Sequence, residues 1–231
     1  MSTLHPTYTD DIFSLSIPVL AVDIVLFTFY RDQLCVVLVP GRNEWAHGRL
    51  TLPGGILGRG ETLEEAADRI LERDTNISGV YKEQLYTFSS HGRDDRGDVI
   101  SCSYYTLVWS QVFLSRIDLT RVALLPYDQV SRDTVAYDHA EIIAYAYQRL
   151  QWKMEYTNVA RNILPAQFSL RELQNVYELI FTKTFDKRNF RKKILSLGML
   201  VETSEYDTTS SKRPARLYRF SDTDLKIIGI L

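Results

Sequence analysis

Residues 53–61 read Pro53-Gly54-Gly55-Ile56-Leu57-Gly58-Arg59-Gly60-Glu61, and a helical pattern continues from there to Ile77. Glycines allow a backbone to approach an anion closely, because glycine has no Cβ. The first turn of the following helix offers free N–H groups to the same anion. This stretch therefore predicts a loop and a helix that bind a phosphate-bearing ligand, with Gly54 and Gly55 in contact with it.

A purely structural role for this helix is the alternative. Thr62 and Glu65 form a capping box, and residues 63–71 carry an apolar stripe at helical spacing. Such a helix can fold without binding anything. The glycine-rich loop is harder to explain in this way, so it favours a ligand site.

The segments around the loop predict an α+β fold. Strand-like runs lie at residues 19–30, 34–39, 84–88, 99–109 and 122–125, and helical patterns lie at 62–73 and 138–155. Hairpins mixed with helices indicate an α+β fold with a mixed sheet. We expect residues 1–156 to form this first domain.

A second domain, residues 157–231, has the pattern of a winged helix-turn-helix. Ser169 begins a capped helix with an apolar face, and Asp186 can cap a second helix. Strand-like segments at 199–203 and 216–220 then predict a hairpin. Helix, turn, helix and hairpin in this order indicate DNA binding.

The charge distribution supports a nucleic-acid surface in one place. The whole chain has a formal net charge of −2, but residues 183–219 alone sum to +6 and the remainder to −8. A basic module on an acidic body concentrates affinity for a polyanion in that module. The expected DNA contacts are Lys187, Arg188, Asn189, Arg191, Lys192 and Lys193 in the second helix, and Lys212, Arg213 and Arg216 in the hairpin.

Arg188 and Asn189 are the expected readers of base edges, because Arg pairs well with guanine and Asn with adenine. The lysines are expected at phosphates. Two alternatives remain for this basic surface. It could simply be a solvated face, or it could bind an acidic protein partner rather than duplex DNA.

The loop and helix at 53–77 resemble the Nudix box. In that pattern, Gly55, Glu61, Arg69, Leu71 and Ile77 stand in register. The resemblance implies a pyrophosphate site built by this segment, with Gly54, Gly55, Glu61, Arg69, Arg73 and Asp74 as its residues. It also implies that the mixed sheet belongs to an α/β/α sandwich, and that Arg69 and Glu61 pair to brace the loop against the helix.

The catalytic positions of the box depart from the pattern. Where it requires glutamates, this chain has Ile70, Arg73 and Asp74, and Asn76 replaces a glycine. Hydrolysis of a diphosphate needs clustered carboxylates that hold divalent cations. Arg73 places a fixed positive charge there, which should repel magnesium and can contact a phosphate. We therefore expect binding without efficient cleavage, with no catalytic residue, no metal ligand and no cofactor.

An enzyme is the alternative. Asp74 with Glu61, Glu64 and Glu65 could hold a cation in an unorthodox way, and the chain would then hydrolyse ADP-ribose or a similar nucleoside diphosphate derivative. Magnesium-dependent turnover that disappears in Asp74→Asn would favour this alternative.

Residues 91–97 join two predicted strands and contain Arg93 and Arg96. Both guanidinium groups are candidates for contacts to an entering phosphate. The alternative is a solvated hairpin loop, because glycine and aspartate are typical of turns. Further along, Asp138 stands at a predicted helix start, where we expect it to act as the cap.

Taken whole, the chain resembles the Nudix-related transcriptional regulators of NAD metabolism. The segments that carry the resemblance are residues 52–61, 93–97, 136–142, 160–165, 168–178, 186–193 and 213–220. The resemblance implies a bacterial regulator, as a rule a repressor, that dimerises and binds palindromic operator DNA. It implies an effector such as ADP-ribose, or a sugar phosphate in branches that govern sugar use.

Composition fits a folded protein of the cytosol. Hydrophobic residues make up 45% and charged residues 24%, which excludes a disordered chain, a collagen or a coiled coil. The longest apolar run, residues 18–30, is interrupted by Asp23 and is too short to span a membrane. No signal peptide pattern begins the sequence, and Cys35 and Cys102 lie in apolar runs typical of buried thiols.

Overall fold

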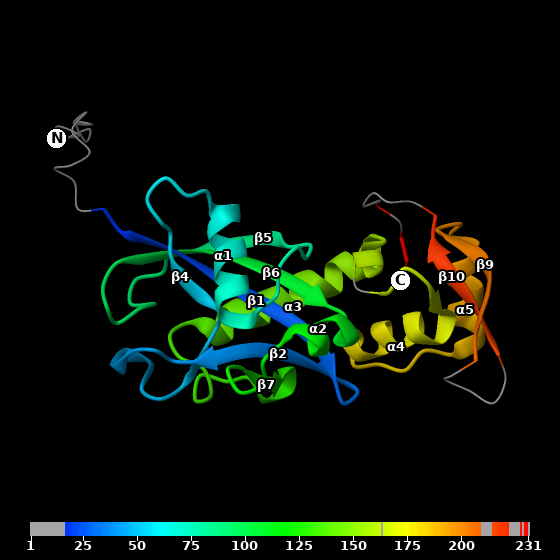
Figure 1. Ribbon diagram of the computed structural model, residues 1–231, viewed down its shortest axis with the longest axis horizontal. Coiled ribbons are helices and arrows are strands. Elements are labelled where there is room, and N and C mark those ends of the chain that lie inside the picture. The colour runs from blue at the N-terminus through cyan, green and yellow to red at the C-terminus, as the bar shows by residue number, and fades with distance from the viewer. Residues whose placement is uncertain (1–16, 163, 209–213, 222–226, 228, 231) are drawn as a thin grey trace, which may run out of the picture.

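The computed structural model describes residues 17–162, 164–208, 214–221, 227 and 229–230. It has two lobes along its long axis, as Figure 1 shows. The larger lobe is a sheet flanked by helices, and the smaller lobe, drawn in yellow to red, combines two helices with a small sheet. The predicted fold class, an α+β mixed-sheet sandwich followed by a winged helix, is confirmed.

The large sheet is built around β1. Its strands are β1 (Val19–Tyr30), β2 (Gln33–Pro40), β3 (Leu50–Thr51), β4 (Gly54–Ile56), β5 (Glu83–Phe88), β6 (Val99–Val108) and β7 (Ala123–Pro126). The strand order is β3-β2-β1-β6-β5, while β4 pairs with β1 and β7 with β2. Because β1 runs parallel to β6 and antiparallel to β2 and β4, the sheet is mixed.

Helices cover both faces of this sheet. They are α1 (Leu63–Thr75), α2 (Ser110–Arg116) and α3 (His139–Tyr156), with 3-10 turns at Glu44–Ala46, Tyr127–Gln129 and Val159–Asn162. On one face, Ile24 of β1 shares a core with Ile70 of α1. On the other face, Phe27 shares a core with Ile143 of α3. Each such buried side chain contributes about 1.5–3 kcal/mol to stability, so β1 is fixed from both sides.

The second lobe is a winged helix. Its elements are α4 (Leu170–Phe181), α5 (Lys187–Ser196) and the strands β8 (Phe168–Ser169), β9 (Leu200–Asp207) and β10 (Ala215–Phe220), in the sheet order β8-β10-β9. Both predicted caps are present. Ser169 and Glu172 make a reciprocal capping box on α4, and the Asp186 side chain accepts a hydrogen bond from the Asn189 backbone N–H at 2.8 Å.

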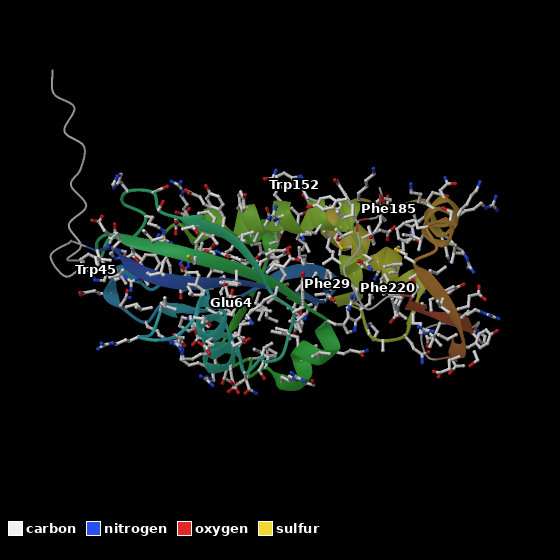
Figure 2. The ribbon with its side chains drawn as sticks, turned by 90° about the horizontal axis from the view of Figure 1, so that it is seen from above. Phe29, Trp45, Glu64, Trp152, Phe185 and Phe220 are labelled. Carbon is white, nitrogen blue, oxygen red and sulfur yellow. The ribbon has the colours of Figure 1, made fainter. Side chains whose placement is uncertain are left out.

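The two lobes share one hydrophobic core. A continuous cluster of buried residues runs from Phe29 of β1 through Met154 of α3 to Tyr177 of α4. Figure 2 shows Phe29 on the side of the sheet lobe that faces the winged helix, and Trp45 at the far end. At the junction, the Tyr147 hydroxyl donates to the backbone carbonyl of Ile180 at 2.7 Å.

Two smaller predictions can be compared with the structure. Cys35 and Cys102 are buried free thiols, as their apolar context predicted. Among the residues that the structure describes, no helix is long and apolar enough to cross a bilayer.

The pairing of β4 with β1 yields a prediction about Gly54, which lies opposite Asp23. A Cβ on residue 54 would stand 2.2 Å from Oδ1 of Asp23. We expect Gly54→Ala to lower the free energy of unfolding by roughly 1–3 kcal/mol, because the buried carboxylate must move. Urea denaturation measures this. Gly229→Ala is the control, since a Cβ there meets no atom within 4 Å. Equal stability of the two variants would contradict the prediction.

Candidate functional site

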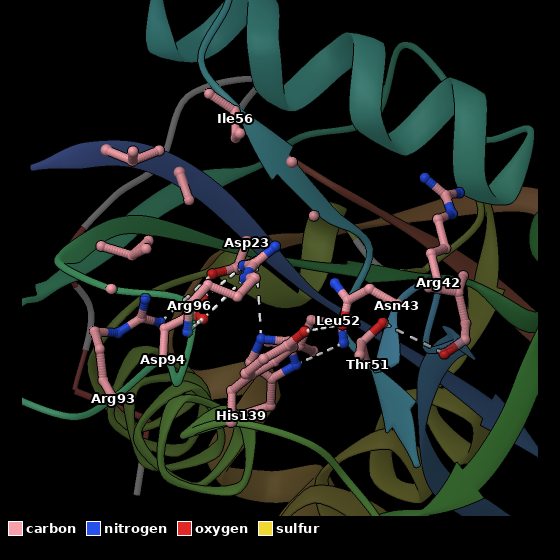
Figure 3. A pocket seen from close by; sticks show the side chains of 18 of the residues that line it. Asp23, Arg42, Asn43, Thr51, Leu52, Ile56, Arg93, Asp94, Arg96 and His139 are labelled. Carbon is pink, nitrogen blue, oxygen red and sulfur yellow. Dashed lines mark hydrogen bonds and ion pairs between the residues drawn. The ribbon is translucent and has the colours of Figure 1, made fainter. Parts of the chain in front are cut away.

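A cavity of about 340 Å³ lies beside the glycine-rich loop. Its walls come from the first half of β1, from β4, from the loops at 42–43 and 93–98, and from the start of α3, as Figure 3 shows in close view. This volume falls in the range of small-molecule sites, roughly 300–1,000 Å³. Gly54 and Gly55 line the cavity, and their predicted contact with a ligand stays a prediction.

Glu61 and Arg69 brace the loop. Arg69 donates from Nε to Oε1 of Glu61 at 2.6 Å and from Nη2 to Oε2 at 2.7 Å, while the Gly58 backbone N–H donates to the same carboxylate. These hydrogen bonds, with that from Arg69 the strongest, lower the pKa of Glu61 to about 2. The pairing that the resemblance implies is therefore present. Neither side chain is among those that line the cavity, so direct ligand contact stays a prediction for both.

Arg73 and Asp74 meet a third residue that the sequence did not single out. Arg73 donates from Nε to Oδ1 of Asp74 at 2.7 Å and from Nη2 to the Gly54 carbonyl oxygen at 2.7 Å. Arg42 also donates to Oδ1 of Asp74. Burial alone would raise the pKa of Asp74, but the two guanidinium groups outweigh burial and hold the pKa below its usual value. Asp74 is therefore a carboxylate in the folded protein at neutral pH.

Arg93 and Arg96 lie on the opposite side of the cavity from Arg42 (Figure 3). Arg93 is buried and makes a bidentate pair with Asp138, at 2.8 and 2.9 Å. Arg96 donates from Nε to Oδ1 of Asp94 at 2.8 Å. Both predicted phosphate contacts line the cavity, but each already has a carboxylate partner, so their contact with a phosphate stays a prediction.

The expected role of Asp138 as a helix cap is wrong. Its side chain makes no capping hydrogen bond on α3, because both carboxylate oxygens accept from Arg93. The next residue, His139, accepts a hydrogen bond on Nδ1 from the Leu52 backbone N–H at 2.9 Å. Full burial lowers the pKa of His139, which is therefore neutral and carries its proton on Nε2, 3.9 Å from Asp23.

Sequence reasoning missed three residues that shape the cavity. Asp23 was noted only as an interruption of an apolar run, although a carboxylate inside a buried strand is itself a signal of a polar site. Arg42 and Tyr137 gave no local signal. Tyr137 has φ of +56°, which is strained for a residue with a side chain, and its hydroxyl donates to Asn43 at 2.9 Å.

The carboxylates do not form a metal site. Within the described part of the chain, no group of three or more His, Cys, Asp or Glu side chains could hold an ion. The set considered for an enzyme is dispersed: Glu65 caps α1, Glu64 accepts from the Tyr104 hydroxyl, and Glu61 pairs with Arg69. The residues present do not fit the divalent cations that the Nudix box implies.

The predicted DNA contacts of α5 form one exposed surface. Lys187, Arg188, Asn189, Arg191, Lys192 and Lys193 are all exposed, while Phe190 and Ile194 face the core. In the hairpin, Arg216 pairs with Glu202 at 2.7 Å and lies over the Tyr206 ring. Lys212 and Arg213 lie outside the described residues. The six polar side chains of α5 are therefore exposed to solvent, whereas Arg216 on β10 is held by its contacts with Glu202 and Tyr206.

Two domain profiles match the chain. That of the NUDIX domain matches residues 18–146, and that of the NrtR DNA-binding winged helix domain matches residues 160–220. Together they cover both lobes of the structure.

Two of the relatives match the chain across both lobes, and a third matches over the first lobe. An ADPR-responsive transcriptional repressor NtrR of Acinetobacter baylyi is 30% identical over 210 residues, which span 90% of this chain and 84% of the relative. The crystal structure of Shewanella oneidensis NrtR with a 27mer DNA is 33% identical, with a TM-score of 0.76, and the match covers 87% of this chain and 93% of that one. The NUDIX domain of the same Shewanella protein with ADP ribose is 32% identical, with a TM-score of 0.53, covering 61% and 93%.

The neutral, buried His139 predicts a pH dependence of stability. Its pKa is lower in the folded protein than the value near 6.5 expected when unfolded, so the unfolded chain takes up a proton that the fold does not. Stability should be complete above about pH 6.5 and fall below it, by up to about 1.4 kcal/mol per pH unit. Denaturation at a series of pH values measures the slope.

We expect His139→Gln to flatten this slope between about pH 7 and 5, because Gln can accept from Leu52 but does not titrate. His91→Gln, at an exposed position, should leave the slope unchanged. If the wild-type protein and His139→Gln lose stability in parallel, the neutral buried histidine is refuted.

Proposed function

Because the chain belongs to the NrtR family, in which a NUDIX domain precedes a winged helix, we propose that it is a transcriptional repressor that responds to ADP-ribose. The winged helix binds operator DNA, and the cavity beside the glycine loop binds the effector. The observation that carries this proposal is the connection between the cavity and the winged helix. One buried core joins the lobe that holds the cavity to the lobe that presents the basic helix.

The exposed face of α5 supports binding to the major groove. Its apolar side chains anchor the helix in the lobe and leave the polar ones outside, as a recognition helix requires. We assign Arg188 and Asn189 to base edges. Lys187, Arg191, Lys192 and Lys193 are assigned to phosphates, where they fix the position of the helix on DNA. For the hairpin we assign Lys212, Arg213 and Arg216 to the DNA backbone or minor groove.

The cavity supports a nucleotide-like effector. Its volume is that of a small-molecule site, and its walls combine glycine backbone with guanidinium and carboxylate groups. We assign Gly54, Gly55, Arg73, Arg93 and Arg96 to contacts with the effector or to its immediate support. Glu61 and Arg69 hold the loop in shape, and Asp74 holds Arg73.

We infer that α3 couples the two sites. Its first residues are fixed at the cavity through Arg93 and Leu52, and its later residues Tyr147 and Gln151 both donate to the Ile180 carbonyl at the end of α4. An effector acts on DNA affinity only by binding one arrangement of the lobes more tightly than another. Displacement of the α3 start is the route that these contacts support.

Three further assignments complete the proposal. We place the boundary between the domains after residue 156, where α3 ends. A homodimer would present two recognition helices to an inverted repeat, which matches the two-fold symmetry of such a site. A regulator of this kind acts in the cytosol, where bacterial DNA lies.

The DNA assignment predicts a salt dependence. In a fluorescence anisotropy titration with a duplex that carries an inverted repeat from upstream of its own gene, Lys192→Ala should flatten the log–log salt slope by roughly 0.9 for each phosphate that the variant no longer neutralises. Arg188→Ala should instead reduce discrimination against a changed base pair, by about 1–3 kcal/mol. Arg59→Ala, an exposed arginine of the other lobe, is the control and should change neither. Weak binding that ignores salt would reject the proposal.

The lack of a metal site predicts that the cavity binds without cleaving. Incubation with ADP-ribose and Mg²⁺ should yield no AMP and ribose phosphate above the background of the buffer, because no carboxylate cluster of the described residues holds the cations that activate water. Product analysis by chromatography measures this. Magnesium-dependent turnover that Asp74→Asn abolishes would show instead that the chain is a hydrolase.

A further inference from the structure

Charge is divided unevenly across the cavity. On the side of the loop at 93–98, the charged residues that line the cavity are Arg93, Arg96, Asp23, Asp94 and Asp98. Asp138 does not line it but pairs with Arg93, and the formal sum of these six groups is −2. On the opposite side, Arg42 and Asp74 line the cavity. Arg73 is not among the lining residues but shares the Asp74 carboxylate with Arg42, and the formal sum of the three groups is +1. Figure 3 shows Arg42 on one side of the cavity and Arg93, Asp94 and Arg96 on the other. The excess positive charge therefore lies only on the Arg42 side.

The shared carboxylate cannot neutralise both arginines. Asp74 is buried, with a side-chain exposure of 1%, whereas the side chains of Arg42 and Arg73 are 55% and 38% exposed. Their remaining N–H groups are available to a ligand, because each guanidinium has five donors in a planar fork that suits phosphate oxygens. Asp74 thus holds two guanidinium groups at one oxygen atom, Oδ1.

Gly55 keeps one of these groups accessible. A Cβ on this residue would lie 3.4 Å from Nη1 and 3.6 Å from Nη2 of Arg73, so any side chain would cover the guanidinium. Gly55 itself lines the cavity. The glycine that begins the loop motif therefore leaves an opening between the cavity and Arg73.

Arg73 also binds the oxygen atoms that a divalent cation would need. It donates to both carboxylate oxygens of Asp74 and to the Gly54 carbonyl oxygen, all at 2.7–2.8 Å. Magnesium binds carboxylate and carbonyl oxygens, and a guanidinium already in place excludes it sterically and by charge. The chain supplies its own permanent cation at this position.

We propose that Arg42 and Arg73 bind the diphosphate of the effector directly, as a built-in replacement for a divalent cation. The opposite side, with its excess of carboxylates, accepts hydrogen bonds from the hydroxyl groups of a ribose. This inference rests on the proposed effector function, and it sets the direction of the bound molecule, with phosphates at Arg42 and hydroxyls toward Asp98. It also makes binding independent of metal.

The test is isothermal titration calorimetry on the full chain, with ADP-ribose and with inorganic pyrophosphate, each in EDTA and in Mg²⁺. We expect the dissociation constant for ADP-ribose to agree within about twofold between the two conditions. Arg42→Gln and Arg73→Gln should each weaken both probes by about tenfold or more, as expected when a charge-assisted hydrogen bond is removed. Arg31→Gln, which removes an equal charge from the exposed turn between β1 and β2, away from the residues that line the cavity, should have no such effect.

Asp74→Asn separates this inference from a metal site, and guards against a variant that fails to fold. Asn keeps one acceptor oxygen that can hold the guanidinium groups but removes the negative charge that neutralises them, so binding of both probes should hold or strengthen in EDTA, with thermal melting as the check on folding. If Asp74 instead held a cation, Asp74→Asn would weaken the binding of both probes. Binding that needs Mg²⁺, or unchanged binding in Arg42→Gln and Arg73→Gln, overturns the inference.

The two probes distinguish failure of this inference from failure of the proposed effector. If ADP-ribose does not bind but pyrophosphate binds without metal and through both arginines, the effector is wrong and the diphosphate site stands. If ADP-ribose binds and neither arginine matters, the effector stands and the site is overturned. If neither probe binds, both proposals fall.

Discussion

The buried ion pair between Arg93 and Asp138 is the contact on which the arrangement of the site depends. Arg93 belongs to the loop between β5 and β6, and Asp138 directly precedes α3, so the pair joins one wall of the cavity to the helix that reaches the other lobe. A buried charge without its partner costs several kcal/mol, so the two residues must stay together unless another charge replaces one of them. Movement of the loop at residues 93–98 is therefore passed to the start of α3.

Helix α3 spans the distance between the cavity and the winged helix. Its 18 residues extend about 27 Å at the usual rise per residue. Because Tyr147 also stacks on Tyr127 and donates to the end of α4, the helix cannot shift without disturbing the winged helix. Contacts of α3 therefore connect the wall of the cavity to the winged helix.

The sequence predicted what depends on local pattern. Periodicity located β1, α1 and α4, and the capping residues Thr62, Ser169 and Asp186 marked the helix starts, because these signals lie within a few residues. It missed what depends on tertiary contact. Arg42 lies 32 residues from Asp74 in the chain, and no local sequence pattern at either residue predicts the ion pair between them. The local pattern at Asp138 predicts a helix cap, but its carboxylate instead accepts hydrogen bonds from Arg93, which lies 45 positions away in the chain.

The single apolar interior that spans the two lobes constrains how this protein can have changed over time. Tyr177 and Ile180 of the winged helix lie in the same buried cluster as Phe29 and Met154 of the neighbouring lobe. Exchanging the winged helix for one of different ancestry would expose these surfaces to water unless the facing residues changed with it. Replacing the winged helix therefore requires matching changes in the sheet lobe, so we expect new DNA specificity to arise more readily by point substitution than by exchange of the whole lobe.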